Sequence, residues 1–316
     1  MAIFKDYLEN KSPLILHGAL GTEMESLGYD ISGKLWSAKY LLEKPEVIQK
    51  IHETYVAAGS DLITTSSYQA TLPGLIDAGL TKEEAEQIIA LTVQLAKDAR
   101  DKVWATLDET EKAKRPYPLI SGDVGPYAAY LANGSEYTGD YGQITIEALK
   151  EFHRPRIQIL LDHGVDLLAL ETIPNHLEAQ ALIELLAEEF PEAEAYISFT
   201  VQEPGTISDG TSLDEIGQLV SQSDQISALG INCSSPLLYN QALAILKNAG
   251  KALITYPNSG EVYDGSTQTW KPKDKDALTL VEHSKDWHDQ FGVKILGGCC
   301  RTRPNDIKAL YAEFRT

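Results

Sequence analysis

Short runs of apolar residues alternate with longer amphipathic segments along the whole chain. Eight such runs occur, at residues 14–20, 61–68, 118–124, 165–172, 195–201, 225–233, 252–256 and 293–296. Most of these runs are continuously hydrophobic and do not alternate between apolar and polar residues. That pattern is typical of strands buried on both faces of a parallel sheet.

The segments between the runs have the periodicity of helices that cover a sheet. They span residues 45–58, 82–106, 144–163, 176–190, 213–221, 237–249 and 277–291, and residues 304–314 follow the eighth run. Several carry start signals: Asn175 precedes the fourth segment, Ser212 and Glu215 suggest a capping box, and Pro304 opens the last. Strand–helix units repeated in this way predict an α/β fold, a TIM (β/α)8 barrel forming a single domain over residues 1–316.

Polar and reactive residues gather where the predicted strands end. In TIM barrels the active site lies at the carboxyl ends of the strands. The residues at those ends are His17, Gly18, Ala19, Ser66, Ser67, Tyr68, Asp123, Glu171, Asn232, Cys233, Cys299 and Cys300. Because the last three strands of such a barrel are neighbours, we expect Cys233 and the Cys299–Cys300 pair to meet at one site.

The three cysteines of the chain predict a metal centre. A lone Cys233 is more often a buried core residue than a ligand. Neighbouring strand residues point to opposite faces, so Cys299 and Cys300 can share one ion only where the strand has ended and the backbone bends. Gly297 and Gly298 are expected to allow that bend. Three thiolates at strand ends predict a Zn2+ site with one open position, as in catalytic zinc sites.

Composition excludes several classes of partner. The formal net charge is −19, which argues against nucleic acid and anionic membranes, because both bind basic surfaces. The chain has no apolar run of about 18 residues, the length that spans a bilayer. An acidic chain without an apolar leader, whose cysteines build no disulfide framework, is expected in the cytoplasm.

Two motifs that contain the cysteines give the chain a family resemblance. They are residues 230–233 (Gly-Ile-Asn-Cys) and 297–300 (Gly-Gly-Cys-Cys), supported by 18–23 (Gly-Ala-Leu-Gly-Thr-Glu) and 170–172 (Leu-Glu-Thr). The chain resembles the homocysteine S-methyltransferases, which include betaine-homocysteine methyltransferase and the homocysteine module of methionine synthase. It is most similar to the stand-alone members that use S-methylmethionine or S-adenosylmethionine, with comparable runs at residues 35–38, 125–137 and 256–264.

The resemblance implies zinc-dependent methyl transfer to the thiol of L-homocysteine, with methionine as the product. Cys233, Cys299 and Cys300 would hold the zinc, and the homocysteine sulfur would enter the open position as the attacking group. A metal-bound thiol is deprotonated at neutral pH, whereas a free thiol is mostly protonated. S-methylmethionine is the expected donor and S-adenosylmethionine the second choice, because a sulfonium methyl is more reactive than the quaternary ammonium methyl of betaine.

Further residues are assigned to the amino acid substrate. Glu171 matches the family's carboxylate for the homocysteine amino group; the alternative is an ordinary salt bridge at a strand end. Gly18 and Ala19 are expected to offer backbone N–H groups to the substrate carboxylate, unless they form a plain glycine turn. Asn232 would orient substrate or a metal ligand, although a strand-end cap would give the same sequence.

Aromatic residues are the expected contacts of the cationic donor. Trp36, Tyr68 and Tyr127 would surround the sulfonium, which aromatic rings attract, unless they are simple core residues. His17 departs from the family, which usually has an acidic residue at this position. A neutral histidine still accepts a hydrogen bond, but the charge presented to the substrate is different.

Three other functions stay open from the sequence. A betaine-type methyltransferase would use the same barrel, and a non-catalytic zinc- or thiol-binding barrel would keep the cysteines without a donor site. A metal-free aldolase or lyase would need an inward lysine at a strand end, whereas Lys294 lies near the start of the eighth strand. Cobalamin- or folate-dependent methionine synthases need additional carrier domains, so the donor is expected to be small and diffusible.

Overall fold

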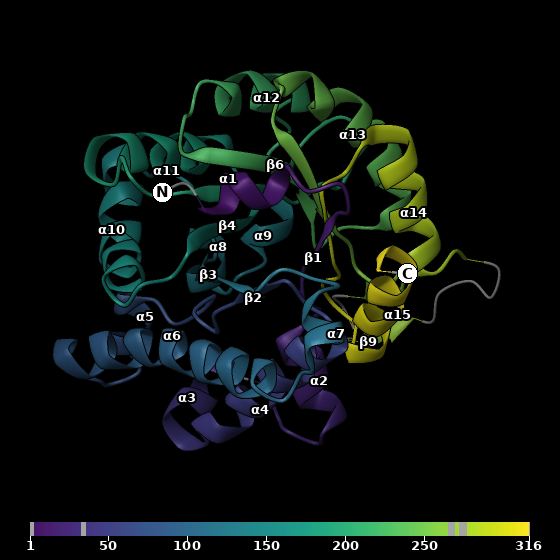
Figure 1. The fold of residues 1–316 in the computed structure, drawn as a ribbon. Helices are drawn as coiled ribbons and strands as arrows, with labels where there is room; N and C mark the ends of the chain where they lie inside the picture. Colours follow the sequence, from purple (N-terminus) through teal and green to yellow (C-terminus); the bar gives the residue numbers. More distant parts are fainter. Residues whose placement is uncertain (1–2, 33–35, 265–268, 272–276, 316) are drawn as a thin grey trace.

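Eight parallel strands pair around a ring in the computed structural model, which describes residues 3–32, 36–264, 269–271 and 277–315 (Figure 1). The strand order is β1-β10-β7-β6-β5-β4-β3-β2. A parallel bridge between Leu16 and Leu62 brings the β1 end of this order to β2 and closes the ring. The predicted TIM barrel is therefore confirmed.

The strands of the barrel are short and lie close to the predicted apolar runs. Their bounds are β1 Leu14–Ile15, β2 Leu62–Thr64, β3 Leu119–Val124, β4 Leu167–Ile173, β5 Ala195–Phe199, β6 Ile226–Asn232, β7 Ala252–Tyr256 and β10 Ile295–Leu296. The first two are shorter than predicted. Helix α2 (Leu20–Ser26) already begins at Leu20, and β2 ends at Thr64, although the N–H of Thr65 still donates to Ser121 of β3 at 2.9 Å. Residues 17–19 and 65–68 of these runs form loops at the mouth of the barrel.

Helices surround the ring on its outer side (Figure 1). The main ones are α4 Pro45–Ala58, α6 Lys82–Trp104, α10 Ile146–Asp162, α11 His176–Glu189, α12 Leu213–Ser221, α13 Tyr239–Leu246, α14 Leu280–Phe291 and α15 Pro304–Phe314. The predicted bounds of α4, α12 and α15 are confirmed. The predicted helix at residues 237–249 is instead a 3-10 turn at Pro236–Leu238, α13 and a second 3-10 turn at Lys247–Ala249, which Gly250 ends with a φ of 70°.

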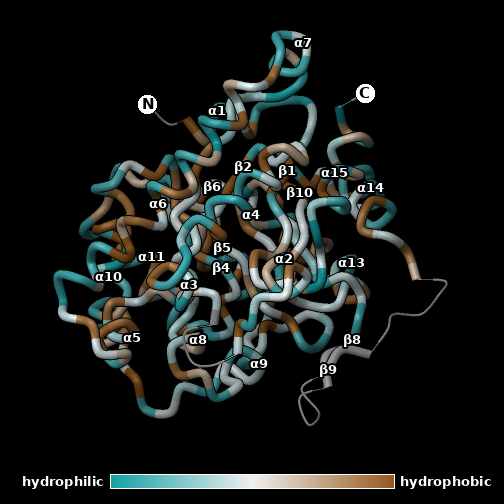
Figure 2. Tube along the Cα trace, turned by 90° about the horizontal axis from the view of Figure 1, so that it is seen from below, coloured by the Kyte–Doolittle hydropathy of each residue, from teal (hydrophilic) through white to brown (hydrophobic). Residues whose placement is uncertain are grey.

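Several short elements were not predicted from the sequence. They are α1 Ile3–Leu8, α2, η1 Trp36–Ala38, α3 Lys39–Glu43, α5 Leu72–Asp77, α7 Glu109–Lys112, α8 Tyr127–Leu131, α9 Ser135–Thr138 and an antiparallel hairpin of β8 Val262–Asp264 with β9 Thr269–Lys271. Each is too short to show a clear apolar period. In Figure 2, α8, α9 and the hairpin lie at the lower edge of the molecule, opposite α1.

Two hydrophobic layers hold the barrel together. The outer layer fills the space between the strands and the surrounding helices. The inner layer fills the barrel with residues from the strands, and Phe4 of α1 completes it as a fully buried plug. The carboxylate of Glu194 accepts the N–H groups of Phe4 and Lys5 at 2.9 and 3.1 Å, which fixes the start of α1 over the amino-terminal end of the barrel.

The β1–β2 closure is reinforced by the end of the chain. Arg315 donates to the buried carboxylate of Asp61 at 2.6 Å and to the carbonyl of Pro13 at 2.9 Å. Asp61 also accepts the N–H of Ile15 at 2.8 Å. Burial raises the pKa of Asp61 to about 6, although Arg315 acts to lower it.

Within the described residues, no helix is long and apolar enough to cross a membrane.

Candidate active site

Three neighbouring strands bring the cysteines together at the carboxyl-terminal end of the barrel. Cys233 follows β6, and Cys299 and Cys300 follow β10, with β7 between the two strands. All three sulfur atoms lie within 4.8 Å of one another, and the Sγ atoms of Cys233 and Cys300 are 3.6 Å apart. The predicted convergence of the three cysteines is thus present in the fold.

Backbone hydrogen bonds fix the strand ends that carry the cluster. The N–H of Cys233 donates to Tyr256 at 3.2 Å, and the N–H of Cys299 donates to Pro257 at 2.7 Å. Cys233 has a φ of 49°, in the left-handed region that non-glycine residues rarely adopt. The chain therefore turns sharply at the cysteine, which takes its side chain out of the strand alternation.

The two glycines before the cysteine pair have a different role from the predicted one. Neither Gly297 nor Gly298 has a positive φ. The nearby residue with a positive φ is Arg301, at 67°. A Cβ on Gly297 would lie 2.7 Å from the Cβ of Leu16, and one on Gly298 would lie 2.4 Å from the Oγ1 of Thr302. Glycine is therefore needed for close approach of the chain, not for an unusual bend.

The donor set fits a zinc ion. Tetrahedral zinc with sulfur ligands at about 2.3 Å requires sulfur–sulfur separations of about 3.8 Å. The Cys233–Cys300 separation of 3.6 Å is close to this value, and all three sulfur atoms lie within 4.8 Å of one another. Hydrogen bonds with Cys233 and Cys299 hold the pKa of the Cys300 thiol well below its usual value. The bond with Cys233 contributes most to raising the pKa of Cys299. Three thiols crowded together in this way are suited to a cation.

Glu171 lies in β4 and belongs to the same electrostatic environment. Its Oε2 accepts a hydrogen bond from the hydroxyl of Tyr256 at 3.1 Å, and that hydroxyl is also bonded to Ser198. Burial is the main cause that raises the pKa of Glu171 to about 7, and the charge of Cys300 adds to it. The hydroxyl of Tyr256 therefore orients the carboxylate of Glu171. Within the described residues, no cationic side chain bonds to this carboxylate.

A second carboxyl group, Asp123 at the end of β3, was noted in the sequence but given no role. It is 5% exposed, and its Oδ1 has no hydrogen-bond partner within the described residues. Burial, followed by the charge of Glu171, raises its pKa well above the usual value. The barrel mouth thus contains two interacting carboxyl groups, which together favour a positively charged ligand.

Asn232 at the end of β6 bonds to β4, from which it is separated by β5. Its Oδ1 accepts the N–H of Thr172 at 3.0 Å, and its Nδ2 donates to the Thr172 hydroxyl at 2.7 Å. Thr172 has a φ of 64°, so these two bonds hold a strained residue directly after Glu171. Asn232 is fully buried, so this arrangement favours a positioning role over direct substrate contact.

The first loop places Gly18 and Ala19 beside the cysteine-bearing loop. The Ala19 N–H already donates to Thr302 at 3.3 Å, whereas the N–H of Gly18 has no acceptor among the described residues. His17 has its Nδ1 2.5 Å from the carbonyl of Gly18, and its Nε2 is buried without a partner. Burial lowers the pKa of His17, so this position presents a neutral ring.

Of the three aromatic candidates, Tyr68 is the one beside the cluster. Burial and then the charge of Cys233 raise its pKa well above the usual value. Tyr127 instead packs in an aromatic group, with its ring centroid 5.0 Å from that of Phe152 and 5.5 Å from that of Tyr141. This packing favours the core alternative for Tyr127. The side chain of Trp36 lies outside the described part of the structure.

A buried ionic network beneath the loops was not predicted. Arg156 is 1% exposed and donates to the carbonyls of Ser67 at 3.2 Å, Tyr68 at 3.0 Å and Gly125 at 2.5 Å. It therefore joins the loops that follow β2 and β3.

Glu178 and His153 complete this network. Glu178 accepts from His153 at 2.8 Å and from the N–H of Tyr127 at 2.6 Å, and an Arg156 nitrogen lies 3.2 Å from His153 Nδ1. All of these charged side chains come from predicted helices. The sequence alone does not distinguish such buried charged residues from charged residues on the exposed face of a helix.

Comparison with known proteins agrees with the geometry. The family model for homocysteine S-methyltransferase matches residues 14–314. Homocysteine S-methyltransferase YbgG of Bacillus subtilis is 44% identical over 96% of this chain and 95% of its own length. Homocysteine S-methyltransferase 1 of Brassica oleracea is 41% identical over 99% of this chain and 97% of its own.

A solved structure also matches over nearly the whole chain. The homocysteine methyltransferase MmuM of Escherichia coli, in its metallated form, has a TM-score of 0.85 and 40% identity, covering 98% of both chains. These matches extend from the first strand to the last helix and include the cysteine-bearing loops. The chain belongs to the homocysteine S-methyltransferase family.

Proposed function

We propose that the protein transfers a methyl group from a small sulfonium donor to the thiol of L-homocysteine, forming methionine. S-methylmethionine is the first candidate donor and S-adenosylmethionine the second. The observation that carries this proposal is the cluster of three cysteines beside the carboxylate of Glu171 in a member of this family. Thiol ligands suit a soft metal, and a carboxylate suits the amino group of an amino acid.

Cys233, Cys299 and Cys300 are the residues that would hold zinc. Zinc bound there would supply a positive charge that keeps a substrate thiol deprotonated at neutral pH. The metallated form of MmuM supports metal binding in the family. His17 and Glu171 are outside the proposed ligand set, so the metal would depend on the cysteines alone.

The other residues of the mouth would bind and orient the two substrates. The homocysteine ammonium group would donate to Glu171, with the free Oδ1 of Asp123 as a second acceptor. The N–H of Gly18 would donate a hydrogen bond to the substrate carboxylate. Tyr68 would place its ring near the sulfonium, since a cation over an aromatic face is stabilised by about 0.5–2 kcal/mol. Methyl transfer then needs alignment of the two sulfur atoms and little proton transfer.

The decisive experiment measures metal content and methionine formation together. We expect about one zinc per chain and expect Cys233→Ser, Cys299→Ser and Cys300→Ser each to lose metal and activity in parallel. The far-ultraviolet circular dichroism of the variants should remain that of the wild type, because the barrel has its own core. Full activity of a zinc-free sample would refute the metal part of the proposal.

The donor is identified by supplying S-methylmethionine, S-adenosylmethionine and betaine separately with homocysteine. We expect the largest kcat/KM with S-methylmethionine. A larger value with betaine would assign the betaine-type reaction. Zinc binding without methionine from any of the three donors would instead favour a non-catalytic thiol-binding protein.

A further inference from the structure

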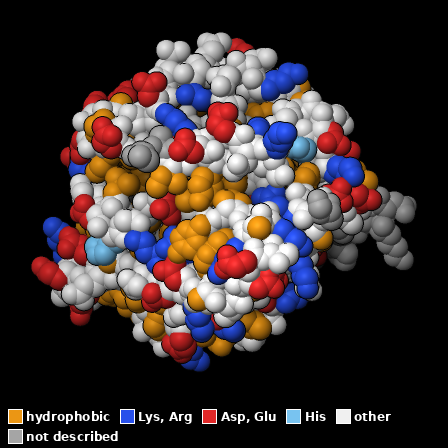
Figure 3. Space-filling view, viewed as in Figure 1, with side chains coloured by type: hydrophobic (Ala, Val, Ile, Leu, Met, Phe, Trp, Pro, Cys, Tyr) orange, Lys and Arg blue, Asp and Glu red, His pale blue; other side chains and the backbone are white. Residues whose placement is uncertain are grey.

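The amino-terminal end of the barrel, opposite the cysteines, contains a cavity of about 570 Å³ lined by four lysines. Lys251 and Lys294 immediately precede β7 and β10, which are paired neighbours in the sheet. Lys5 comes from α1, and Lys247 follows α13. Figure 3 looks onto this face, where α1 lies over the barrel.

No ion pair among the described residues neutralises the charge of these lysines. The ammonium groups of Lys5, Lys251 and Lys294 each donate to a backbone carbonyl, at 3.1, 2.6 and 3.0 Å. Within the described residues, none of the four lysines forms a salt bridge, although Asp and Glu outnumber Lys and Arg by 46 to 27. Lysines elsewhere, such as Lys102 with Glu53 at 2.7 Å, do pair with carboxylates.

The cavity is positively charged and has unused hydrogen-bonding groups. Its lining includes two acidic residues, Glu9 and Asp224, against the four lysines. Burial lowers the pKa of Lys251, and the charge of Lys5 adds to this effect, whereas Asp224 opposes it. The hydroxyl of Ser227, also in the lining, is buried without a partner in the described structure. An anion between the lysines would relieve their repulsion and use donors that are now unpaired.

We propose that this cavity binds a phosphate-bearing small molecule of nucleotide size, with its phosphate between Lys5, Lys251 and Lys294. Lysines bind phosphate as point charges with three donors each. Ligand cavities for molecules of this size have volumes of about 300–1,000 Å³, and most have apolar walls. Leu8, Leu253 and Phe291 supply such a wall here.

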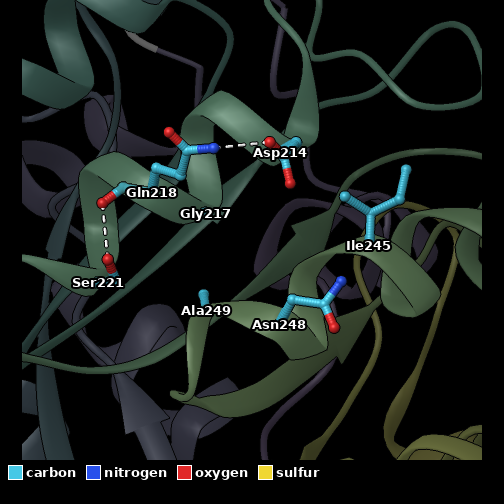
Figure 4. A pocket seen from close by; sticks show the side chains of 7 residues that line it. All are labelled: Asp214, Gly217, Gln218, Ser221, Ile245, Asn248 and Ala249. Carbon is cyan, nitrogen blue, oxygen red and sulfur yellow. Dashed lines mark hydrogen bonds between the residues drawn. The ribbon is translucent and has the colours of Figure 1, made fainter.

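Another hollow of the molecule does not have these properties. It lies between α12 and the turn after α13, has a volume of about 80 Å³ and is drawn in Figure 4. Three of its polar side chains lie on α12 and are bonded there: Gln218 donates to Asp214 at 2.7 Å, and the hydroxyl of Ser221 donates to the carbonyl of Gln218 at 2.7 Å. The hollow is small and has no cationic side chain in its lining.

The proposal is tested by calorimetric titration of the protein as purified with AMP, adenosine and inorganic phosphate. AMP is chosen because it binds metal ions weakly. We expect AMP to bind about ten-fold more tightly than adenosine or phosphate, because it alone satisfies both the lysines and the apolar wall. Its affinity should fall as salt increases, since the phosphate contact is electrostatic.

Matched variants locate the site. Lys251→Gln combined with Lys294→Gln should weaken AMP binding about ten-fold or more, whereas Lys114→Gln combined with Lys308→Gln removes the same charge outside the cavity and should leave it unchanged. Equal binding by both double variants would overturn the proposal, as would AMP binding no better than adenosine. Inorganic phosphate that binds as tightly as AMP would overturn the part of the proposal that requires a ligand of nucleotide size. Methionine formation is not the readout, so these outcomes are independent of the proposed reaction.

Discussion

At the scale of single residues, Glu171 is the clearest determinant of substrate orientation. Replacing Glu171 by Gln keeps its shape and an oxygen for Tyr256 but removes the negative charge. A charge-assisted hydrogen bond contributes about 1.5–3 kcal/mol. We therefore expect the homocysteine KM to rise by about one to two orders of magnitude, with kcat changed less.

Two controls separate this role from a structural one. The zinc content of Glu171→Gln should equal that of the wild type, because the cysteines alone hold the metal. Tyr256→Phe removes the hydroxyl that orients the carboxylate and keeps its charge, so its KM should rise less. An unaltered KM in Glu171→Gln, or loss of zinc, would show that Glu171 does not bind the amino group.

His52 in α4 makes a separate, pH-dependent contribution at the residue scale. It is 4% exposed, and burial, followed by the charge of His17, lowers its pKa to about 3 from 6.5. Between these values the unfolded chain binds a proton that the folded chain does not. The folded state therefore loses stability as pH falls below 6.5, by up to about 1.4 kcal/mol per pH unit from this residue.

Replacement of His52 by Gln should remove this dependence. We expect the free energies of unfolding of wild type and His52→Gln to converge or cross as the pH falls from 7 toward 4, measured by urea denaturation. Replacement of the exposed His163 by Gln is the matched control. Parallel profiles for wild type and His52→Gln would show that His52 is protonated in the folded protein.

At the scale of elements, Arg156 on α10 holds the loops after β2 and β3 in their relative positions. Arg156→Lys keeps the charge but cannot reach three carbonyls with one ammonium group. Because Tyr68 is one of these partners, we expect kcat/KM for the donor to fall about ten-fold, mainly through KM, with unchanged zinc content.

The same helix offers a matched control. Arg154 pairs with Glu189 at 2.8 Å on the surface, so Arg154→Lys should leave kcat/KM and KM at wild-type values. If Arg156→Lys also keeps the wild-type KM while its melting temperature falls, Arg156 stabilises the fold without positioning Tyr68.

The elements also show what the sequence could and could not predict. Long helices such as α4 have a clear apolar period and start signals, so their bounds were predicted correctly. The cysteines were predicted to converge because parallel strands of a barrel end on one face. The Arg156 network and the short helix α1 depend on contacts between segments far apart in the sequence. Local sequence patterns do not indicate such contacts.

At the scale of the whole molecule, the barrel depends on α1 to complete its interior. Phe4 is fully buried among the inward residues of the strands, and Ile3 on the same helix is 43% exposed. Phe4→Ala would leave a cavity at the end of the barrel, and such changes cost about 3–5 kcal/mol. We expect a clear fall in the midpoint of urea unfolding, and Ile3→Ala should leave it nearly unchanged. Similar midpoints for both variants would show that α1 does not close the core.

The pairing of β1 with β10, near opposite ends of the chain, has a consequence for biosynthesis. During translation β1 emerges first, yet its principal partner is made last, and its contact with β2 is a single bridge. The edges of the growing sheet therefore stay unpaired until synthesis is nearly finished, and such edges are prone to pair with other chains. We expect the nascent protein to be most dependent on chaperones just before release from the ribosome.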